Sequence, residues 1–143
     1  MKWRMPLSLL AFAWISLGPA GAQSIVGKWL GLDSPQTWVK CWLNEPRPDG
    51  TFEVTFLADA PFGLRRQVEQ GTWSLANGVY STITTLIDGS KVNPGNPQFK
   101  DTYRIIELTD EKLVFSHIER GWQFSANRVP NSFVLGQTCP ISN

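Results

Sequence analysis

The sequence has few of the residues on which most enzyme and metal sites depend. Its 143 residues include one histidine and two cysteines, and 13 Lys and Arg nearly balance 12 Asp and Glu. Because structural zinc sites need about four nitrogen and sulfur ligands, we expect no metal. The serine motif of hydrolases and the glycine-rich phosphate loop are also missing, so we expect no cofactor. Without a basic patch, neither a nucleic acid nor an anionic membrane is an expected partner.

An apolar run long enough to span a membrane is missing too. Lys2 and Arg4 precede the apolar stretch 6–17, which has about twelve residues, whereas a spanning helix needs roughly 20. Small residues follow, ending at Ala22, which is the pattern of a signal peptide. We expect segment 1–22 to be cleaved and to leave one domain over 23–143, in the periplasm or secreted. An uncleaved N-terminal anchor is the alternative.

Cleavage and export would change the net charge of the chain and would make a disulfide between its two cysteines the expected state. It removes two of the 13 basic residues, so that 11 face 12 acids and the net charge changes from +1 to −1. Cys41 and Cys139 remain, and an even cysteine count in an exported chain favours a disulfide. The bridge would tie the C-terminal tail to the second predicted strand. Two free thiols are the alternative.

Short segments with alternating polar and apolar residues fill the rest of the chain. Phe52, Val54 and Phe56, for example, alternate with polar residues, whereas no window shows a sustained helical period. Asn77-Gly78 is typical of a type I′ hairpin turn. The predicted strands are 25–30, 37–43, 51–56, 64–75, 79–87, 99–108, 113–119 and 122–129, with a short ninth candidate at 132–135. Sequential hairpins favour an all-β, eight-stranded antiparallel up-and-down barrel with little or no helix, and an antiparallel sandwich is the alternative.

Two glycines precede a tryptophan inside predicted strands. Gly27-Lys28-Trp29 is echoed by Gly71-Thr72-Trp73. A glycine at such a place often marks a bulge or a bend, and we expect one at Gly71.

These features resemble the lipocalin and avidin-like barrels. The resemblance rests on Gly27-x-Trp29 in the first strand, on the eight-strand meander, and on Arg128 near the end of the last strand. The chain is more similar to the bacterial lipocalin-like proteins, through its stretches 47–52, 71–73 and 101–105. The resemblance implies that Arg128 packs over Trp29 and closes the base of the barrel, with Gly27 as a further structural residue. The C-terminal helix of vertebrate lipocalins has no counterpart.

Aromatic residues are the main sign of a ligand site. A cavity with aromatic walls and a few hydroxyl groups is how small-ligand sites are built. Tyr80, Thr82 and Thr84 place hydroxyl groups on one face of a strand. The candidate ligand-binding residues are Trp38, Trp42, Tyr80, Tyr103, Phe115, His117 and Trp122. The alternative is that these aromatics only fill the core.

A catalytic interpretation depends on the single histidine. His117, with Glu119 two residues later, is a candidate acid or base, and a barrel isomerase or cyclase would add Tyr80 and Tyr103. A histidine hydrogen-bonded inside the barrel is the alternative. Strand carboxylates also occur, but alternation alone does not say which of them point inward. They are Glu53, Glu69, Asp101 and Glu107.

Binding of a small, largely apolar ligand is therefore the leading function. Arg65-Arg66 would lie at the mouth of the barrel, either as a clamp for an anionic ligand or as a solvated pair. A second interpretation is an inhibitor or immunity-type protein that contacts another exported protein through its loops, 44–50 and 88–97. The barrel isomerase or cyclase is the third.

Overall fold

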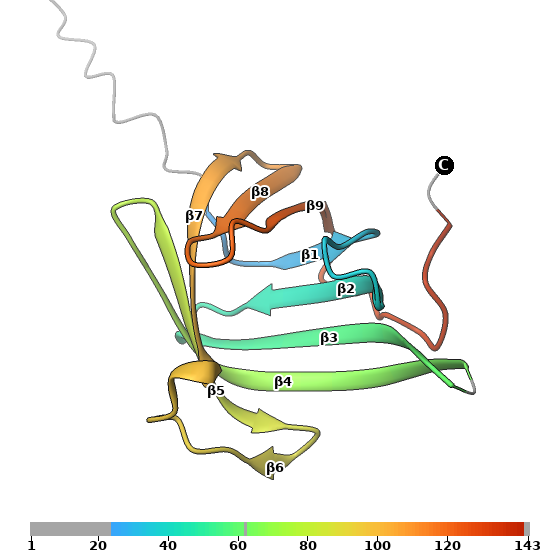
Figure 1. Cartoon of the computed structure of the whole chain (residues 1–143). Coiled ribbons are helices and arrows are strands. Elements are labelled where there is room, and N and C mark those ends of the chain that lie inside the picture. The colour runs from blue at the N-terminus through green and yellow to red at the C-terminus, as the bar shows by residue number, and fades with distance from the viewer. Residues whose placement is uncertain (1–23, 62, 142–143) are drawn as a thin grey trace, which may run out of the picture.

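The computed structural model describes residues 24–61 and 63–141, so the predicted signal peptide over 1–22 lies outside the described residues. Its strands are β1 (Lys28–Gly31), β2 (Val39–Pro46), β3 (Thr51–Ala60), β4 (Gly63–Ala76), β5 (Val79–Ile87), β6 (Ser90–Lys91), β7 (Lys100–Leu108), β8 (Lys112–His117) and β9 (Gln123–Val129), and a short 3-10 helix η1 (Pro97–Phe99) precedes β7 (Figure 1). Among these residues none forms a helix that is long and apolar enough to cross a membrane.

The strands form a closed antiparallel barrel. The sheet runs β4-β3-β2-β1-β9-β8-β7-β5, and an additional β4–β5 pairing joins its two ends. The short β6 pairs only with the end of β5 in the described chain. The predicted eight-stranded up-and-down barrel is thus confirmed, and the sandwich alternative is not. Closure removes the unpaired edges that an open meander would expose.

The two ends of the barrel are named here the base and the mouth. Turns 47–50, 77–78 and 109–111 connect strands at the base, whereas the connections 32–38, 88–99 and 118–122 and the end of β3 lie at the mouth. Asn77 and Gly78 both have positive φ, 52° and 73°, as a type I′ turn requires. The tight Asn-Gly turn that the sequence predicts is therefore present at the base.

Gly71 lies where the pairing of β4 with β5 slips by one residue. Gln70 pairs with Leu86 but Gly71 pairs with Thr84, so the additional residue is on β5. A Cβ atom at Gly71 would collide with the backbone oxygen of Ile83. The predicted irregularity is confirmed, and close approach of the two backbones explains why glycine occupies the position.

Three local predictions differ from the structure. The strand predicted over 37–43 continues to Pro46 because Asn44 to Pro46 pair with β3, so most of the predicted 44–50 loop is strand and tight turn. The predicted loop 88–97 contains β6, since Asp88 and Gly89 adopt positive φ and reverse the chain there. The ninth candidate, 132–135, is not a strand but part of an irregular tail.

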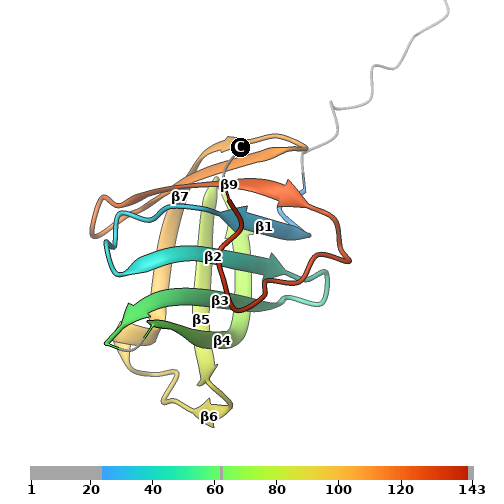
Figure 2. The same cartoon turned by 90° about the vertical axis from the view of Figure 1, so that its right-hand side faces the viewer.

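That tail covers a second apolar core on the outside of the barrel. In Figure 2 it crosses the outer face of β2 and β3. Leu135 is buried there with Leu30, Leu43 and Leu57. The Cys41–Cys139 disulfide, which the cysteine count predicted, is confirmed and joins β2 to the tail across a sequence separation of 98. The Arg66 side chain also holds the tail, because it donates to the Leu135 backbone oxygen over 2.8 Å. The first three strands are therefore covered on both faces.

Candidate functional site

The base of the barrel is closed by Arg128. Its guanidinium carbon lies 4.1 Å from the ring centre of Trp29, and the side chain donates to the backbone oxygens of Ser24, Val26 and Asp110, each over 2.7 Å. Gly27 adopts a φ of 132°, and a Cβ atom there would collide with the Arg128 guanidinium. Trp29 is fully buried and its indole N–H donates to the Ile25 backbone oxygen. These residues form a lid over the base.

The opposite half of the barrel encloses a cavity of about 270 Å³. Small-molecule sites range from about 300 to 1,000 Å³, so this one suits a molecule of one or two rings. Residues from the mouth connections and from seven strands meet in it. The lining residues are Gln36, Trp38, Trp42, Asn44, Phe52, Val54, Phe56, Gln67, Glu69, Tyr80, Thr82, Thr84, Asp101, Tyr103, Phe115, His117, Arg120, Trp122 and Phe124. All seven candidate ligand-binding residues from the sequence lie along this cavity.

Aromatic rings pack against one another along one wall of the cavity. The rings of Phe115 and Phe124 stack with centres 5.3 Å apart, and Trp42 meets Phe115 edge to face at 5.8 Å. Tyr103 also meets Phe115 edge to face, at 5.1 Å. Burial raises the pKa of the Tyr103 hydroxyl well above its ordinary range, so this group stays neutral. The wall is apolar and fixed by mutual packing.

A row of hydroxyl groups on β5 faces the aromatic wall. Tyr80, Thr82 and Thr84 are buried and line the cavity on alternate positions of the strand. The Tyr80 hydroxyl oxygen is buried without a hydrogen-bond partner. Burial raises the pKa of this hydroxyl to about 12, and the nearby Asn44 side chain, which lies outside hydrogen-bond geometry, only partly opposes the rise. An unpartnered buried hydroxyl costs about 1–3 kcal/mol, which favours a partner supplied from the cavity.

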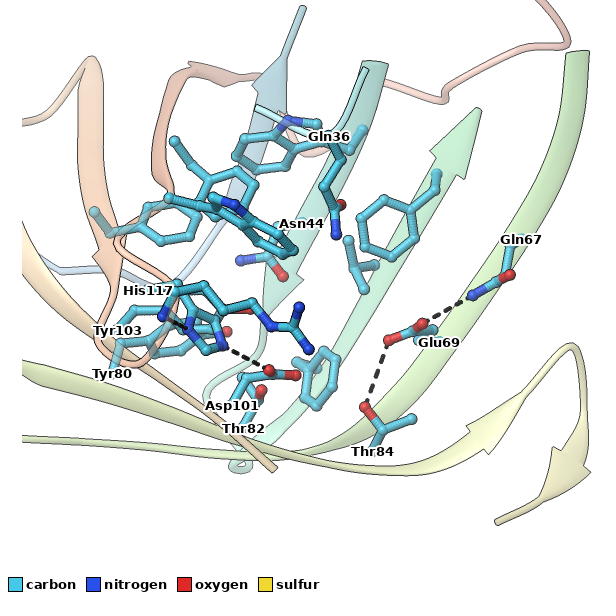
Figure 3. Close-up of a pocket in the computed structure, with 18 of the residues that line it drawn as sticks. Gln36, Asn44, Gln67, Glu69, Tyr80, Thr82, Thr84, Asp101, Tyr103 and His117 are labelled. Carbon is cyan, nitrogen blue, oxygen red and sulfur yellow. Dashed lines mark hydrogen bonds and ion pairs between the residues drawn. The ribbon is translucent and has the colours of Figure 1, made fainter. Parts of the chain in front are cut away.

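His117 is held in one tautomer. Its Nδ1 accepts the backbone N–H of Arg120 over 3.2 Å, so that nitrogen carries no proton. The proton is therefore on Nε2, which lies 2.9 Å from Oδ1 of Asp101 and donates to it (Figure 3). Both ring nitrogens of this buried, neutral histidine are engaged. Its effect is to orient the Asp101 carboxylate and leave Oδ2 as a free acceptor.

Glu69 is the second carboxylate in the cavity. It accepts hydrogen bonds from the Gln67 amide over 2.9 Å and from the Thr84 hydroxyl over 3.5 Å (Figure 3). Burial raises the pKa of the Glu69 carboxyl, and the negative charge of Asp101 acts in the same direction. The hydrogen bonds from Gln67 and Thr84 only partly offset this. The ionised form of Glu69 is thus disfavoured by desolvation and by the negative charge of Asp101.

Several predicted residues lie away from the cavity. The strand predicted over 113–119 ends at His117, and Glu119 is exposed in the following turn, so the structure does not pair these two residues. Arg65 and Arg66 do not line the cavity either, and Arg66 holds the C-terminal tail on the outer face. The structure therefore gives no support to a clamp for an anionic ligand, which was one of the two interpretations of this pair.

The polar lining was largely missed from the sequence. Glu69 shares its strand face with Trp73, which packs against the interior cluster, and Asp101 shares its face with Tyr103. A face shared with an aromatic residue is the sequence signal that both carboxylates carry, although it does not by itself single them out. The other missed lining residues are Gln36, Asn44, Gln67 and Arg120. In residues 24–61 and 63–141, no three His, Cys, Asp or Glu side chains gather closely enough to hold a metal ion.

Comparisons with known proteins agree with this architecture. No protein-family model and no curated protein matches the sequence. Among solved structures, a lipocalin-like protein from Bacteroides uniformis ATCC 8492 is similar over 73% of this chain and 97% of its own, with 20% identity and a TM-score of 0.53. An uncharacterized protein from Bacteroides eggerthii DSM 20697 is similar over 74% of this chain and 100% of its own, with 16% identity and a TM-score of 0.51. At these identities the likeness shows the fold alone, and that fold is a lipocalin-like barrel.

Proposed function

We propose that this protein binds a small, largely apolar molecule inside its barrel, in a compartment outside the cytoplasm. The observation that carries the proposal is the aromatic-walled cavity of about 270 Å³, closed by Trp29 and Arg128 at the base and reached from the mouth. Sites for small molecules combine such apolar walls with a few polar groups that fix orientation. Tyr80, Asp101 and Glu69 supply those polar groups here.

Binding explains features of the cavity that a filled core does not. Core packing removes voids and pairs buried polar groups, since both defects cost stability. This cavity keeps an open volume, an unpartnered Tyr80 hydroxyl and a half-buried Glu69 carboxylate. Because both nitrogens of His117 are engaged, we propose binding rather than catalysis.

Export is supported by two features that are independent of each other. The N-terminal segment 1–22 has the pattern of a signal peptide. The Cys41–Cys139 disulfide belongs to an oxidising compartment such as the periplasm or the extracellular space.

A binding screen on a pair of matched variants tests the proposal. Thermal shift and calorimetry with a panel of fatty acids and aromatic metabolites should find ligands for the oxidised protein. Val54→Trp fills the cavity and should abolish binding, whereas Ile106→Trp, on the exposed outer face, should leave it unchanged. Binding that survives Val54→Trp, or a panel without a single ligand, would refute the proposal.

A further inference from the structure

The cavity contains more negative than positive charge. Glu69 accepts hydrogen bonds from a neutral amide and a neutral hydroxyl, and Asp101 accepts one from neutral His117. Among the described residues no Lys or Arg forms an ion pair with either carboxylate. Both carboxylates are half-buried, and partial desolvation makes a nearby cation favourable. A cationic ligand would supply that charge.

Arg120 is the one cationic side chain among the lining residues. Its guanidinium carbon lies 4.7 Å from the ring centre of Trp122, in the exposed turn that follows β8. Its backbone N–H donates to His117, so Arg120 lies at the same end of the cavity as Asp101, but among the described residues its side chain forms no ion pair. With two carboxylates against one arginine, the lining remains net negative.

Polar and aromatic groups continue from the carboxylates toward the base. Tyr80 and Thr84 are four residues apart on β5, which places their Cα atoms about 13 Å apart along the strand. Tyr80 is 2% exposed and lines the cavity, and its hydroxyl has no hydrogen-bond partner. The rings of Tyr103 and Phe115 lie beside Tyr80, with centres 6.0 and 6.5 Å from that of its own ring. A bound molecule would therefore have its charge at one end of an apolar body.

We propose that the ligand is a small organic cation, namely a protonated amine on an apolar body of one or two rings. This inference rests on the proposed function. The ammonium group of the ligand lies at Glu69 and Asp101, which Figure 3 places at the same end of the cavity, and its body lies along the aromatic wall.

The chemistry of an ammonium group fits this end of the cavity. It has three N–H donors and no acceptor, and the free Oδ2 of Asp101 and the Glu69 carboxylate are acceptors. Aromatic rings attract cations through their negative faces, most strongly when water is excluded. A bound cation also relieves the repulsion between Glu69 and Asp101 that raises the pKa of Glu69. A carboxylate ligand would instead add a third negative charge.

Three probes with one skeleton test the charge preference. Phenethylamine, 2-phenylethanol and phenylacetate are titrated calorimetrically into the oxidised protein at neutral pH. We expect the amine to bind about tenfold or more tightly than the alcohol, since charge-assisted hydrogen bonds are the stronger ones, and the acid to bind most weakly. An alcohol or acid that binds as tightly as the amine overturns the proposal and still supports a small-molecule site.

Matched variants locate the cation. Glu69→Gln and Asp101→Asn should each lower the affinity for phenethylamine about tenfold and change that for 2-phenylethanol less than threefold. Glu53→Gln is the control, because Glu53 lies on the neighbouring β3, outside the cavity lining, and pairs with Arg47 at 3.6 Å. Equal losses in the control, or unchanged amine affinity in both cavity variants, overturn the proposal. If neither these probes nor the wider panel binds, the proposed function fails with it.

Discussion

The closed base and the open half of the barrel use polar groups in different ways. At the base, the Arg128 side chain donates to three backbone oxygens and covers Trp29, whose own indole N–H has a partner. In the open half, the Tyr80 hydroxyl has no hydrogen-bond partner and the half-buried Glu69 carboxylate lies near the like charge of Asp101.

This difference indicates that residues at the base stabilise the fold, whereas residues in the open half serve ligand binding. Paired polar groups at the base contribute to folding, whereas unpaired ones in the cavity cost stability and persist where a ligand can pair with them. Substitutions at the base or on the outer face should therefore change unfolding and leave affinity intact. Substitutions in the open half should lower affinity, and those that remove an unpaired polar group should raise stability.

The disulfide should give the largest effect on stability. The Cys41→Ser, Cys139→Ser double variant releases a closure spanning 98 residues, for which the chain-entropy model gives about 4.7 kcal/mol. Urea unfolding should show a loss of this order, while affinity for a ligand of the cavity stays within threefold of wild type. A comparable loss of affinity would mean that the tail also shapes the cavity.

Arg128→Ala should give the next largest effect. It removes charge-assisted hydrogen bonds to three backbone oxygens and the contact with Trp29, so we expect a loss of about 3 kcal/mol in the free energy of unfolding. Arg104→Ala is the control, since Arg104 is exposed on β7 and its loss should cost less than about 0.5 kcal/mol. Equal effects of the two variants would contradict the lid at the base.

Tyr80→Phe should have a smaller effect of opposite sign. Removing a buried hydroxyl usually costs stability when the hydroxyl is hydrogen-bonded, but here it removes an unpartnered group. We expect the free energy of unfolding to rise by about 1 kcal/mol, measured by urea titration of the ligand-free protein. A fall of similar size would show that the hydroxyl has a protein partner in solution.

Glu69 should make stability depend weakly on pH. Burial raises its pKa above the ordinary value of 4.5, so between these two values the folded state holds more protons than the unfolded state. Glu69 therefore destabilises the folded state least in acid. The free energy of unfolding falls as the pH rises through the raised pKa. Glu69→Gln should become progressively more stable than wild type above pH 4.5. A difference between the two proteins that is constant with pH would contradict this.

The barrel was predictable because its signals are local. Alternation in segments such as 51–56 and the Asn77-Gly78 turn need only neighbouring residues, and the predicted strand set closes into the observed barrel. Strand ends were less predictable. β8 stops at His117 because the chain turns there, and Gly121 adopts a φ of 68°. Glu119 therefore lies in the turn and not in the cavity.

The polar half of the site was not predictable to the same degree. Alternation tells which residues share a face but not which face turns inward. In the sequence, Glu69 and Asp101 were therefore no better candidates for the cavity than Glu53 and Glu107. The slip of register between Gln70 and Gly71 also changes which residues of β5 lie opposite β4. Aromatic residues were easier to place, because their burial is favourable on any inward face.

The most direct test of the account follows the five indole N–H signals of residues 24–141 by NMR. Trp38, Trp42 and Trp122 line the cavity, whereas Trp29 and Trp73 lie outside its lining and donate to backbone oxygens near the base. On titration with phenethylamine, the account predicts shifts for the first three signals and none for the other two. Shifts of Trp29 and Trp73 alone, equal shifts of all five, or no shift at saturating probe would contradict it.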